Sequence, residues 1–494
     1  MESDNRISCV QGCCWNESAS QMSTSKSRRI LITPNVASPY DQRMVQGLAD
    51  GFNRIGHFAG AMPTPLSAVE LYQACQSLSI DTVIQINRTR DLAVPLPKIV
   101  RHVAWFQDVF PETLSGFAER FRGDDILYAL GDAAVLGLVT PIPCRVGSLF
   151  TGVDEATLNF SRRGLVQDID MSLCGALPPP VALTPSLRTD LLWYIDKLIG
   201  GVPCLGRSKG IWAVRRLLFN KYVPVDYVPY AALLAIAQVV EGFYRPLRGE
   251  LDIHMLADAM GELSKTFSDV PMEPPGKAIV EEPDTLSRLL KPYAARFNGR
   301  GDFKARVFRF LAKEGTYFAS DGLSPLARAT SYFAQSYPRI MDRRLLIQLA
   351  AGVTDSLELY GSGLALHDFT RPYYKGVIES IGELLSVYCR SKINLSNNTH
   401  GLGLHSRTLE CMAVGGFIFM HDSPHDTKAG GMLTEFEPDV HYGRYTVESF
   451  HEDATRWLKD SEGRIRVGMQ AVECIRQRHC WHHRALQIIE DLDR

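Results

Sequence analysis

The chain has 494 residues, of which 45% are hydrophobic and 22% are charged, so it is long enough for two or more domains with ordinary apolar cores. Its 53 basic side chains are balanced by 55 acidic ones, and no overall positive field would attract nucleic acid. The eleven cysteines have no regular spacing, residues 1–27 carry no secretory signal, and no segment reaches the length of an apolar membrane span. We expect a cytoplasmic protein without an integral membrane segment.

The N-terminal part of the chain alternates between strand-like and helix-like patterns. After a polar tail over 1–27, which we expect to be disordered, short apolar runs occur at 28–33, 82–86, 102–106, 126–130 and 144–146. Strands that alternate with helices form parallel sheets with helices on their faces. Residues 28–155 therefore predict a Rossmann-like domain.

The strand pattern begins again at 169–175 and continues at 357–360, 393–395 and 417–420. This predicts a second Rossmann-like domain built from 156–180 and 338–494. Between these two parts, over 181–337, apolar residues recur at helical spacing and predict a helical insertion. The expected fold is therefore α/β, with two Rossmann-like domains facing each other across a cleft.

A strand, a polar loop and a helix start follow one another over residues 392–417. Gly401 and Gly403 allow a ligand to approach the loop backbone, and Ser406 is predicted to cap the helix. The free amides of the first turn and Arg407 are suited to phosphate groups, and Glu410 can accept hydrogen bonds from ribose hydroxyls. Alternatively, Glu410 complements the helix dipole and Arg407 is a solvated surface residue.

The run 405–416, HSRTLECMAVGG, resembles the S-x-R-x-x-E-x-x-A-x-G-G element of the CgeB-like glycosyltransferases, relatives of the retaining enzymes with the GT-B fold. Residues 168–175 are similar to the D-V-S-F-V-G strand of that family, and 478–484 to its H-T-Y-x-x-R segment. The resemblance covers 168–178 and 339–490 well. In the N-terminal half it is loose and rests on 105–108 and 152–154.

The resemblance implies a glycosyltransferase whose C-terminal domain binds a nucleotide sugar and whose N-terminal domain presents a glycan or protein acceptor. The nucleotide sugar is a co-substrate, and neither a cofactor nor a metal ion is expected. The implied donor-binding residues are Gly361, Lys375, Asn398, Gly403, Leu404, His405, Ser406, Arg407 and Glu410. Leu402 departs from the retaining enzymes, which often have a sugar-binding glutamate at this position, and the helical insertion is a second departure.

Asp108 and His400 are the predicted catalytic residues. Asp108 follows a strand and is placed to take a proton from an acceptor hydroxyl, although it can equally cap the next helix. His400 and His405 flank the phosphate loop, where an imidazolium would offset leaving-group charge, or they are ordinary loop histidines. Lys375 is placed either to reach phosphates or to lie on the surface.

Two groups of residues suggest metal ligands but are interpreted otherwise. Segment 479–483 contains His479, Cys480, His482 and His483, yet it lacks a second ligand pair, and its side chains are expected to point around a helix. Asp168-Ile169-Asp170 has the letters of a metal-binding Asp-x-Asp, but it precedes its strand. We therefore predict no metal site.

Other functions remain open at this stage. A nucleotide-sugar epimerase or a phosphorylase on the same scaffold is one alternative. A degenerate GT-B protein that binds a nucleotide sugar or a protein partner is another, and Leu402 is the feature in its favour. The sugar, the base, the acceptor and the oligomeric state are left undetermined.

Overall fold

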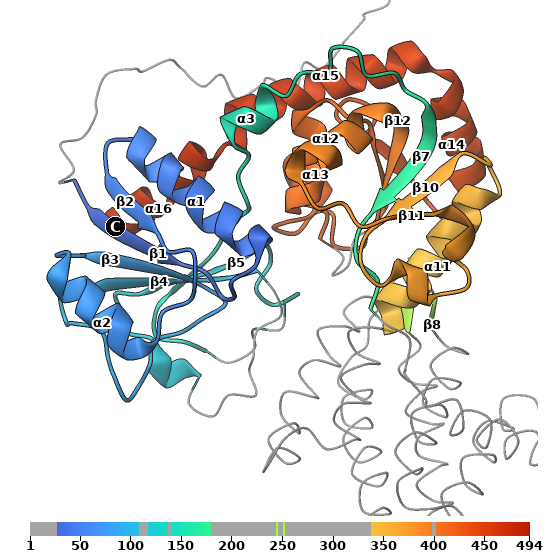
Figure 1. Ribbon diagram of the computed structural model, residues 1–494. Coiled ribbons are helices and arrows are strands. Elements are labelled where there is room, and N and C mark those ends of the chain that lie inside the picture. Colours follow the sequence, from blue (N-terminus) through green and yellow to red (C-terminus); the bar gives the residue numbers. More distant parts are fainter. Residues whose placement is uncertain are drawn as a thin grey trace, which may run out of the picture.

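A computed structural model describes residues 27–107, 117–136, 138, 141–178, 244–245, 250–251, 337–397 and 402–494. Within them the chain forms two parallel sheets of six strands each, flanked by helices (Figure 1). This confirms the predicted α/β fold with two Rossmann-like domains. The predicted tail and the predicted helical insertion fall almost entirely outside the described residues. Within the insertion the structure describes a strand pair, β8 (Tyr244–Arg245) and β9 (Glu250–Leu251).

The N-terminal sheet has the strand order β2-β1-β3-β4-β5-β6, and all neighbouring strands run parallel. The strands are β1 (Arg29–Thr33), β2 (Phe58–Ala61), β3 (Thr82–Ile86), β4 (Arg101–Phe106), β5 (Ile126–Ala129) and β6 (Arg145–Ser148). The helices are α1 (Pro39–Arg54), α2 (Ala68–Ser77) and α3 (Glu155–Leu158). Each predicted strand overlaps one of these, whereas β2 was not predicted.

Helix α1 begins at a cap that its own sequence supplies. Ser38 Oγ accepts a hydrogen bond from the Asp41 amide at 3.0 Å, and Pro39 has no amide to leave unpaired in the first turn. The apolar side of the helix, which includes Leu48 and Phe52, is buried in the core of the N-terminal domain. This burial fixes α1 on its sheet.

The C-terminal sheet has the order β11-β10-β7-β12-β13-β14, again with all neighbours parallel. Its strands are β7 (Ile169–Cys174), β10 (Leu357–Tyr360), β11 (Tyr374–Gly376), β12 (Ser391–Ser396), β13 (Ile418–His421) and β14 (Gly443–Tyr445). Its helices are α11 (Tyr337–Ala351), α12 (Ile381–Arg390), α13 (Ser406–Ala413), α14 (Phe450–Lys459) and α15 (Ser461–Arg478). Strand β7 lies in the middle of the sheet, although the whole predicted insertion separates it from β10.

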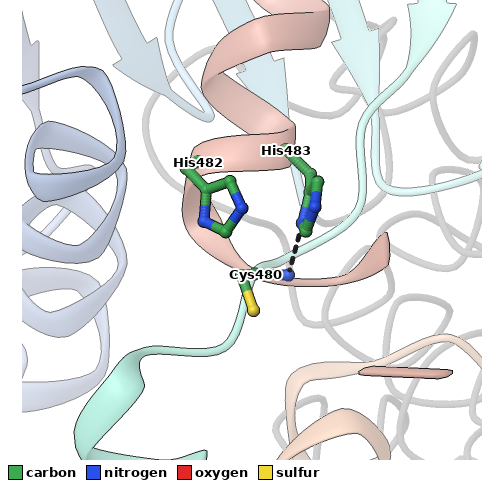
Figure 2. A group of neighbouring side chains, drawn as sticks. All are labelled: Cys480, His482 and His483. Atoms are coloured by element: carbon green, nitrogen blue, oxygen red, sulfur yellow. Dashed lines mark hydrogen bonds between the residues drawn. The ribbon is translucent and has the colours of Figure 1, made fainter. Parts of the chain in front are cut away.

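The chain crosses between the domains twice, and the two crossings pair with each other. The Val153 amide donates to the His479 carbonyl at 2.8 Å, and the Trp481 amide donates to the Val153 carbonyl at 3.3 Å. At the second crossing Cys480 precedes helix α16 (Trp481–Asp493), and His482 and His483 lie in its first turn (Figure 2). The paired crossings form the hinge between the domains.

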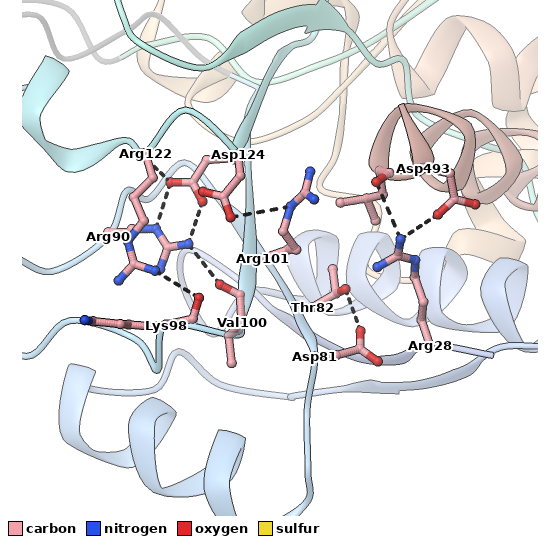
Figure 3. A network of polar contacts seen from close by, with 12 residues as sticks. Arg28, Asp81, Thr82, Arg90, Lys98, Val100, Arg101, Arg122, Asp124 and Asp493 are labelled. Carbon is pink, nitrogen blue, oxygen red and sulfur yellow. Dashed lines mark hydrogen bonds and ion pairs between the residues drawn. The ribbon is translucent and has the colours of Figure 1, made fainter. Parts of the chain in front are cut away.

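Helix α16 returns to the N-terminal domain, where the chain ends (Figure 1). Trp481, Ile488 and Leu492 are buried in the N-terminal core, and Arg28 pairs with Asp493 at 2.5 Å (Figure 3). Residues 338–494 were all predicted to belong to the C-terminal domain. The structure differs for α16, because the apolar side of this helix covers the N-terminal sheet. None of the helices in the described part of the chain is long and apolar enough to cross a membrane.

Candidate functional site

A cleft between the two domains holds two adjoining cavities of about 920 and 680 Å³. On the N-terminal side, Tyr40 and Arg43 of α1 line both cavities. On the C-terminal side, both cavities reach Cys174, Gly361 and Arg407. Volumes of this order are typical of sites for small-molecule and cofactor-sized ligands.

The strand order predicts where a ligand binds in the C-terminal sheet. The order changes direction at β7, which lies between β10 and β12, and open α/β sheets bind ligands at such a switch point, at the carboxyl ends of the strands. Cys174 is the last residue of β7, and Ser396 and Asn397 lie at the end of β12. All three residues line the 680 Å³ cavity. The start of α13 lines the same cavity.

The N-terminal domain contributes amide side chains from the carboxyl ends of its strands. Asn35 follows β1, Asn87 follows β3 and Gln107 follows β4, and all line the 680 Å³ cavity. Asn87 has a positive φ of 50°, and its Oδ1 accepts a hydrogen bond from the Gln107 amide at 2.7 Å. This side of the cleft therefore presents hydrogen-bonding groups suited to a ligand with many hydroxyls. Asp108 comes next in the chain and lies outside the described residues.

The start of α13 is capped by His405, not by Ser406 as predicted. His405 Nδ1 accepts a hydrogen bond from the Arg407 amide at 3.5 Å, while Ser406 lies inside the first turn and donates from Oγ to His405 Nδ1 at 3.2 Å. Burial, followed by the charge of Arg407, lowers the pKa of His405 to about 3. In the empty site His405 therefore favours the neutral imidazole, which can accept the hydrogen bond of the helix amide.

A cluster of guanidinium groups surrounds the start of α13. Arg407 donates to the Cys174 carbonyl at 2.9 Å, and Arg343 of α11 donates to the Ala176 carbonyl and to Asn397 Oδ1 at 3.2 Å. Both approach Gly175 at the place of a side chain, because a Cβ atom there would meet Arg407 Nη1 at 2.4 Å and Arg343 Nη2 at 2.9 Å. A residue without a side chain therefore lets the two charges come close together.

Arg343 is a costly residue in this position. Its pKa is well below the usual value because of burial and then because of the charges of Arg407 and Arg339, which the nearby Asp342 only partly opposes. Like charges held together in a buried site favour a bound anion, and the free amides of a helix start add to that preference. The end of the cleft near α13 is therefore suited to binding an anion.

Glu410 lies one turn into α13, with only 8% of its side chain exposed. Burial raises its pKa to about 6, against the opposing charges of Arg43 and Arg407. Its Oε1 accepts a hydrogen bond from Arg43 Nη1 at 3.2 Å, so the ion pair joins the two domains across the cleft. A buried carboxylate at this place can accept hydrogen bonds from hydroxyl groups of the ligand whose anionic part binds near α13.

Gly361 and Gly403, both predicted donor-binding residues, have packing reasons to be glycine. Gly361 has a φ of 142°, and a Cβ atom there would lie 2.4 Å from the Gly175 carbonyl oxygen. Gly403 packs against Met432, since a Cβ atom would meet Met432 Cγ at 2.3 Å. Both glycines also line the cleft.

The remaining predicted residues take different positions. Leu404 is buried and lines the cleft, whereas Lys375 lies on strand β11, where its Nζ is 3.7 Å from Glu358 Oε1. Leu402 is buried in the core of the N-terminal domain and packs next to Gly131, so it contacts the opposite domain. Asn398 and His400 lie outside the described residues.

Arg43, Arg339 and Arg343 were not predicted. Arg339 and Arg343 are four residues apart on α11, a spacing that places two basic residues on one side of a helix. That spacing is a signal in the sequence, but it is common on solvated surfaces. Arg43 carries no signal, because its partner Glu410 is on the other domain.

The two groups of possible metal ligands have other roles. Asp168 and Asp170 begin β7, at the end of the strand opposite to Cys174, where Asp168 pairs with Arg390 and Asp170 with Lys392, each at 2.6 Å. Their positions explain both carboxylates as part of the fold.

The ligand atoms of Cys480, His482 and His483 lie within 4.8 Å of one another (Figure 2), so the expectation that these side chains point apart is wrong. His483 Nδ1 accepts the hydrogen bond of the Cys480 amide at 3.1 Å, and Cys480 Sγ lies 3.7 Å from the Ile475 carbonyl oxygen. Burial is the main cause of the lowered pKa values of both histidines, and the charge of Arg54 contributes to them. In this arrangement the hydrogen bond between the Cys480 amide and His483 caps the start of α16.

Residues 339–490 match a protein-family model described as glycosyl transferase-like. The match includes Arg343, Arg407 and Glu410, and it also includes most of α16, which packs on the N-terminal domain. It covers less than half of the chain, and this segment is similar to the glycosyl transferase-like family. No curated protein matches the chain.

Several solved structures are similar over most of the chain. A glycosyltransferase from Rickettsia africae ESF-5 is 9% identical, with 94% of this chain and 98% of that chain covered and a TM-score of 0.41. Anabaena Alr3699/HepE, in complex with UDP-glucose, is 11% identical, with 94% and 99% covered and a TM-score of 0.41. AviGT4, a glycosyltransferase involved in avilamycin A biosynthesis, is 10% identical, with 94% and 97% covered and a TM-score of 0.40. Because these likenesses are so distant, the fold is assigned from the two sheets themselves.

Proposed function

We propose that this protein is a glycosyltransferase that moves a sugar from a nucleotide-sugar donor to a glycan or protein acceptor. One observation carries the proposal. The anion site formed by Arg343, Arg407 and the start of α13 adjoins the buried carboxylate of Glu410, at the switch point of the sheet and inside the segment that matches the family. A nucleoside diphosphate carries both kinds of group that such neighbouring sites bind, phosphates and ribose hydroxyls.

The arrangement suggests how the donor is held and activated. Arg343, Arg407 and the first amides of α13 would bind the diphosphate and stabilise the negative charge that develops on it as the sugar leaves. Glu410 would accept hydrogen bonds from the ribose hydroxyls. These groups support leaving-group departure without a metal ion, which is part of the proposal.

The N-terminal domain would present the acceptor through the wall formed by Asn35, Asn87 and Gln107. Asp108, which follows Gln107, would take the proton of the attacking hydroxyl, and closing the cleft would exclude competing water. The sequence resemblance adds two points to the proposal. The protein would belong to the CgeB-like group, and the transferred sugar would retain its configuration.

A second candidate is a protein that binds a nucleotide sugar without transferring it. Leu402 supports it, because this residue packs into the N-terminal core by Gly131 instead of offering a carboxylate to a sugar. The two candidates differ in turnover. A transferase releases the nucleoside diphosphate from its nucleotide sugar when an acceptor is present, and a binding protein does not.

The experiment that tests the proposal is calorimetric titration of the full chain with UDP, ADP, GDP and TDP. We expect one of them to bind and Glu410→Ala to raise its Kd about 10- to 100-fold, the usual loss for a hydrogen bond to a buried charged group. Glu452→Ala, at an exposed position on α14, is the control and should bind as the parent does. If no nucleoside diphosphate binds, the proposed function is wrong. If only the effect of Glu410→Ala is missing, the ribose assignment is wrong.

A further inference from the structure

The Arg43–Glu410 ion pair crosses the cleft where the two cavities adjoin. Arg43 lines both cavities, while Glu410 lines only the smaller one. The Arg43 side chain is 36% exposed and the Glu410 side chain 8% exposed, so the pair joins an accessible cation to a buried anion. A ligand group that binds the carboxylate of Glu410 must therefore share it with Arg43 or displace Arg43 from it.

The backbone of Arg43 is held in place by the hinge. One turn further along α1, Gly47 packs against the Trp481 ring, where a Cβ atom would lie 2.2 Å from Trp481 Nε1. Gly51 packs against the Trp481 carbonyl, where a Cβ atom would lie 2.6 Å from that oxygen. Trp481 begins α16 directly after the second crossing. Its contacts therefore fix the position of α1 relative to the hinge.

We propose that Arg43 is a positioning residue. It forms an ion pair with the carboxylate of Glu410 in the empty cleft, and the ribose of the donor displaces it from that carboxylate. The inference rests on the proposed function. The guanidinium keeps Glu410 ionised in its buried site and holds the α1 side of the cleft against α13. When the ribose hydroxyls take over the carboxylate, the Arg43–Glu410 contact is lost, so the arrangement of the domains that closes around the donor differs from that of the empty cleft.

The experiment compares Arg43→Ala and Arg43→Lys with the parent at pH 8, alone and combined with Glu410→Ala. We expect Arg43→Ala to lower the Kd of the bound nucleoside diphosphate about two- to fivefold, since the competing ion pair is partly exposed and of modest strength. Arg43→Lys, which retains the charge, should restore most of the parent Kd. In the Glu410→Ala background, Arg43→Ala should change nothing further.

A second measurement needs no nucleotide. Small-angle scattering of the empty protein should give a larger radius of gyration for Arg43→Ala than for the parent, and Arg43→Lys should reverse the change. Weaker nucleotide binding by Arg43→Ala would overturn the proposal, because Arg43 would then contact the donor directly. An unchanged radius, or an equal effect of Arg43→Ala with and without Glu410, would overturn it as well. If no nucleotide binds, the proposed function is wrong. The scattering measurement then still tests whether the Arg43–Glu410 pair holds the domains of the empty protein together.

Discussion

At the scale of single residues, the chemistry of the cleft depends on Glu410. Its pKa is raised to about 6 by burial, even though Arg43 and Arg407 lower it. Ionising the buried carboxyl group therefore costs folding free energy. The stabilising contribution of the neutral form is fully present below the ordinary pKa and is lost as the pH rises through about 6.

Nucleotide binding should show the opposite dependence on pH, because ribose hydroxyls need the ionised carboxylate as acceptor. Lowering the pH from 7.5 to 5 should raise the Kd of the nucleoside diphosphate about tenfold, following the loss of the charged form. Glu410→Gln should bind more weakly at pH 7.5 and depend less on pH than the parent, since only the terminal phosphate of the nucleotide, with a pKa of about 6, then titrates. Calorimetric titrations at several pH values measure both curves. A parent profile as flat as that of Glu410→Gln would contradict the assignment.

Residue identity alone indicated part of this site. Ser406, Arg407 and Glu410 follow a strand and a glycine-containing loop, and that pattern predicted an anion site at a helix start. The capping role of His405 was missed, because its neutral state depends on burial among guanidinium groups from α11 and α13. Such surroundings cannot be inferred from neighbours in the chain.

At the scale of elements, helix α11 connects the predicted insertion with the anion site. It begins at Tyr337 and carries Arg343 to the carbonyl of Ala176, just after β7. The segments that lead into and out of 181–337 therefore meet at the switch point. Neither the bounds of α11 nor its place beside β7 was predicted from the sequence.

Replacing Arg343 should separate stability from binding. Because Arg343 is buried among like charges, Arg343→Met should leave the thermal midpoint of unfolding unchanged or raise it, as replacements of buried charges by apolar side chains often do. The same change should raise the Kd of the nucleoside diphosphate at least tenfold. Arg344→Met, at an exposed position on the same helix, is the matched control. Loss of stability together with unchanged binding would show that Arg343 is structural only.

Short edge strands were the elements that sequence patterns missed. Strand β2 has the sequence FAGA, and β11 and β14 are three residues each, so they offer no apolar run to recognise. The central strands β1, β3, β4, β7, β12 and β13 were predicted, because strands buried on both faces are nearly continuous apolar runs. The strand order then followed from pairing, which no local pattern determines.

At the scale of the whole molecule, helix α16 joins the domains. It leaves the C-terminal domain at the paired crossings and covers the N-terminal sheet, where Tyr128 Oη donates to Asp491 at 2.6 Å. Trp481 packs edge-on against Trp105, with the ring centroids 6.3 Å apart. The N-terminal core is therefore completed by the last helix of the chain.

Trp481→Ala should accordingly destabilise the N-terminal domain. Removing a buried aromatic side chain from a packed core costs about 3–5 kcal/mol, and the cavity would lie where α1 meets the hinge. Leu486→Ala, at a 43% exposed position on the same helix, should cost much less. Urea unfolding followed by circular dichroism measures both. Equal midpoints for the two variants would show that α16 does not support the N-terminal core.

The sequence by itself determined the two Rossmann-like domains and the strand, loop and helix start that lead into α13, because apolar periodicity and loop chemistry are local properties. Tertiary structure decided which side chains meet across the cleft. The pairing of Arg43 with Glu410, the approach of Arg343 to Arg407 and the return of α16 to the first domain all join residues that are far apart in the chain. Such contacts arise only when the sheets, the helices on them and the two domain crossings are in place, since long-range packing and burial depend on the complete fold.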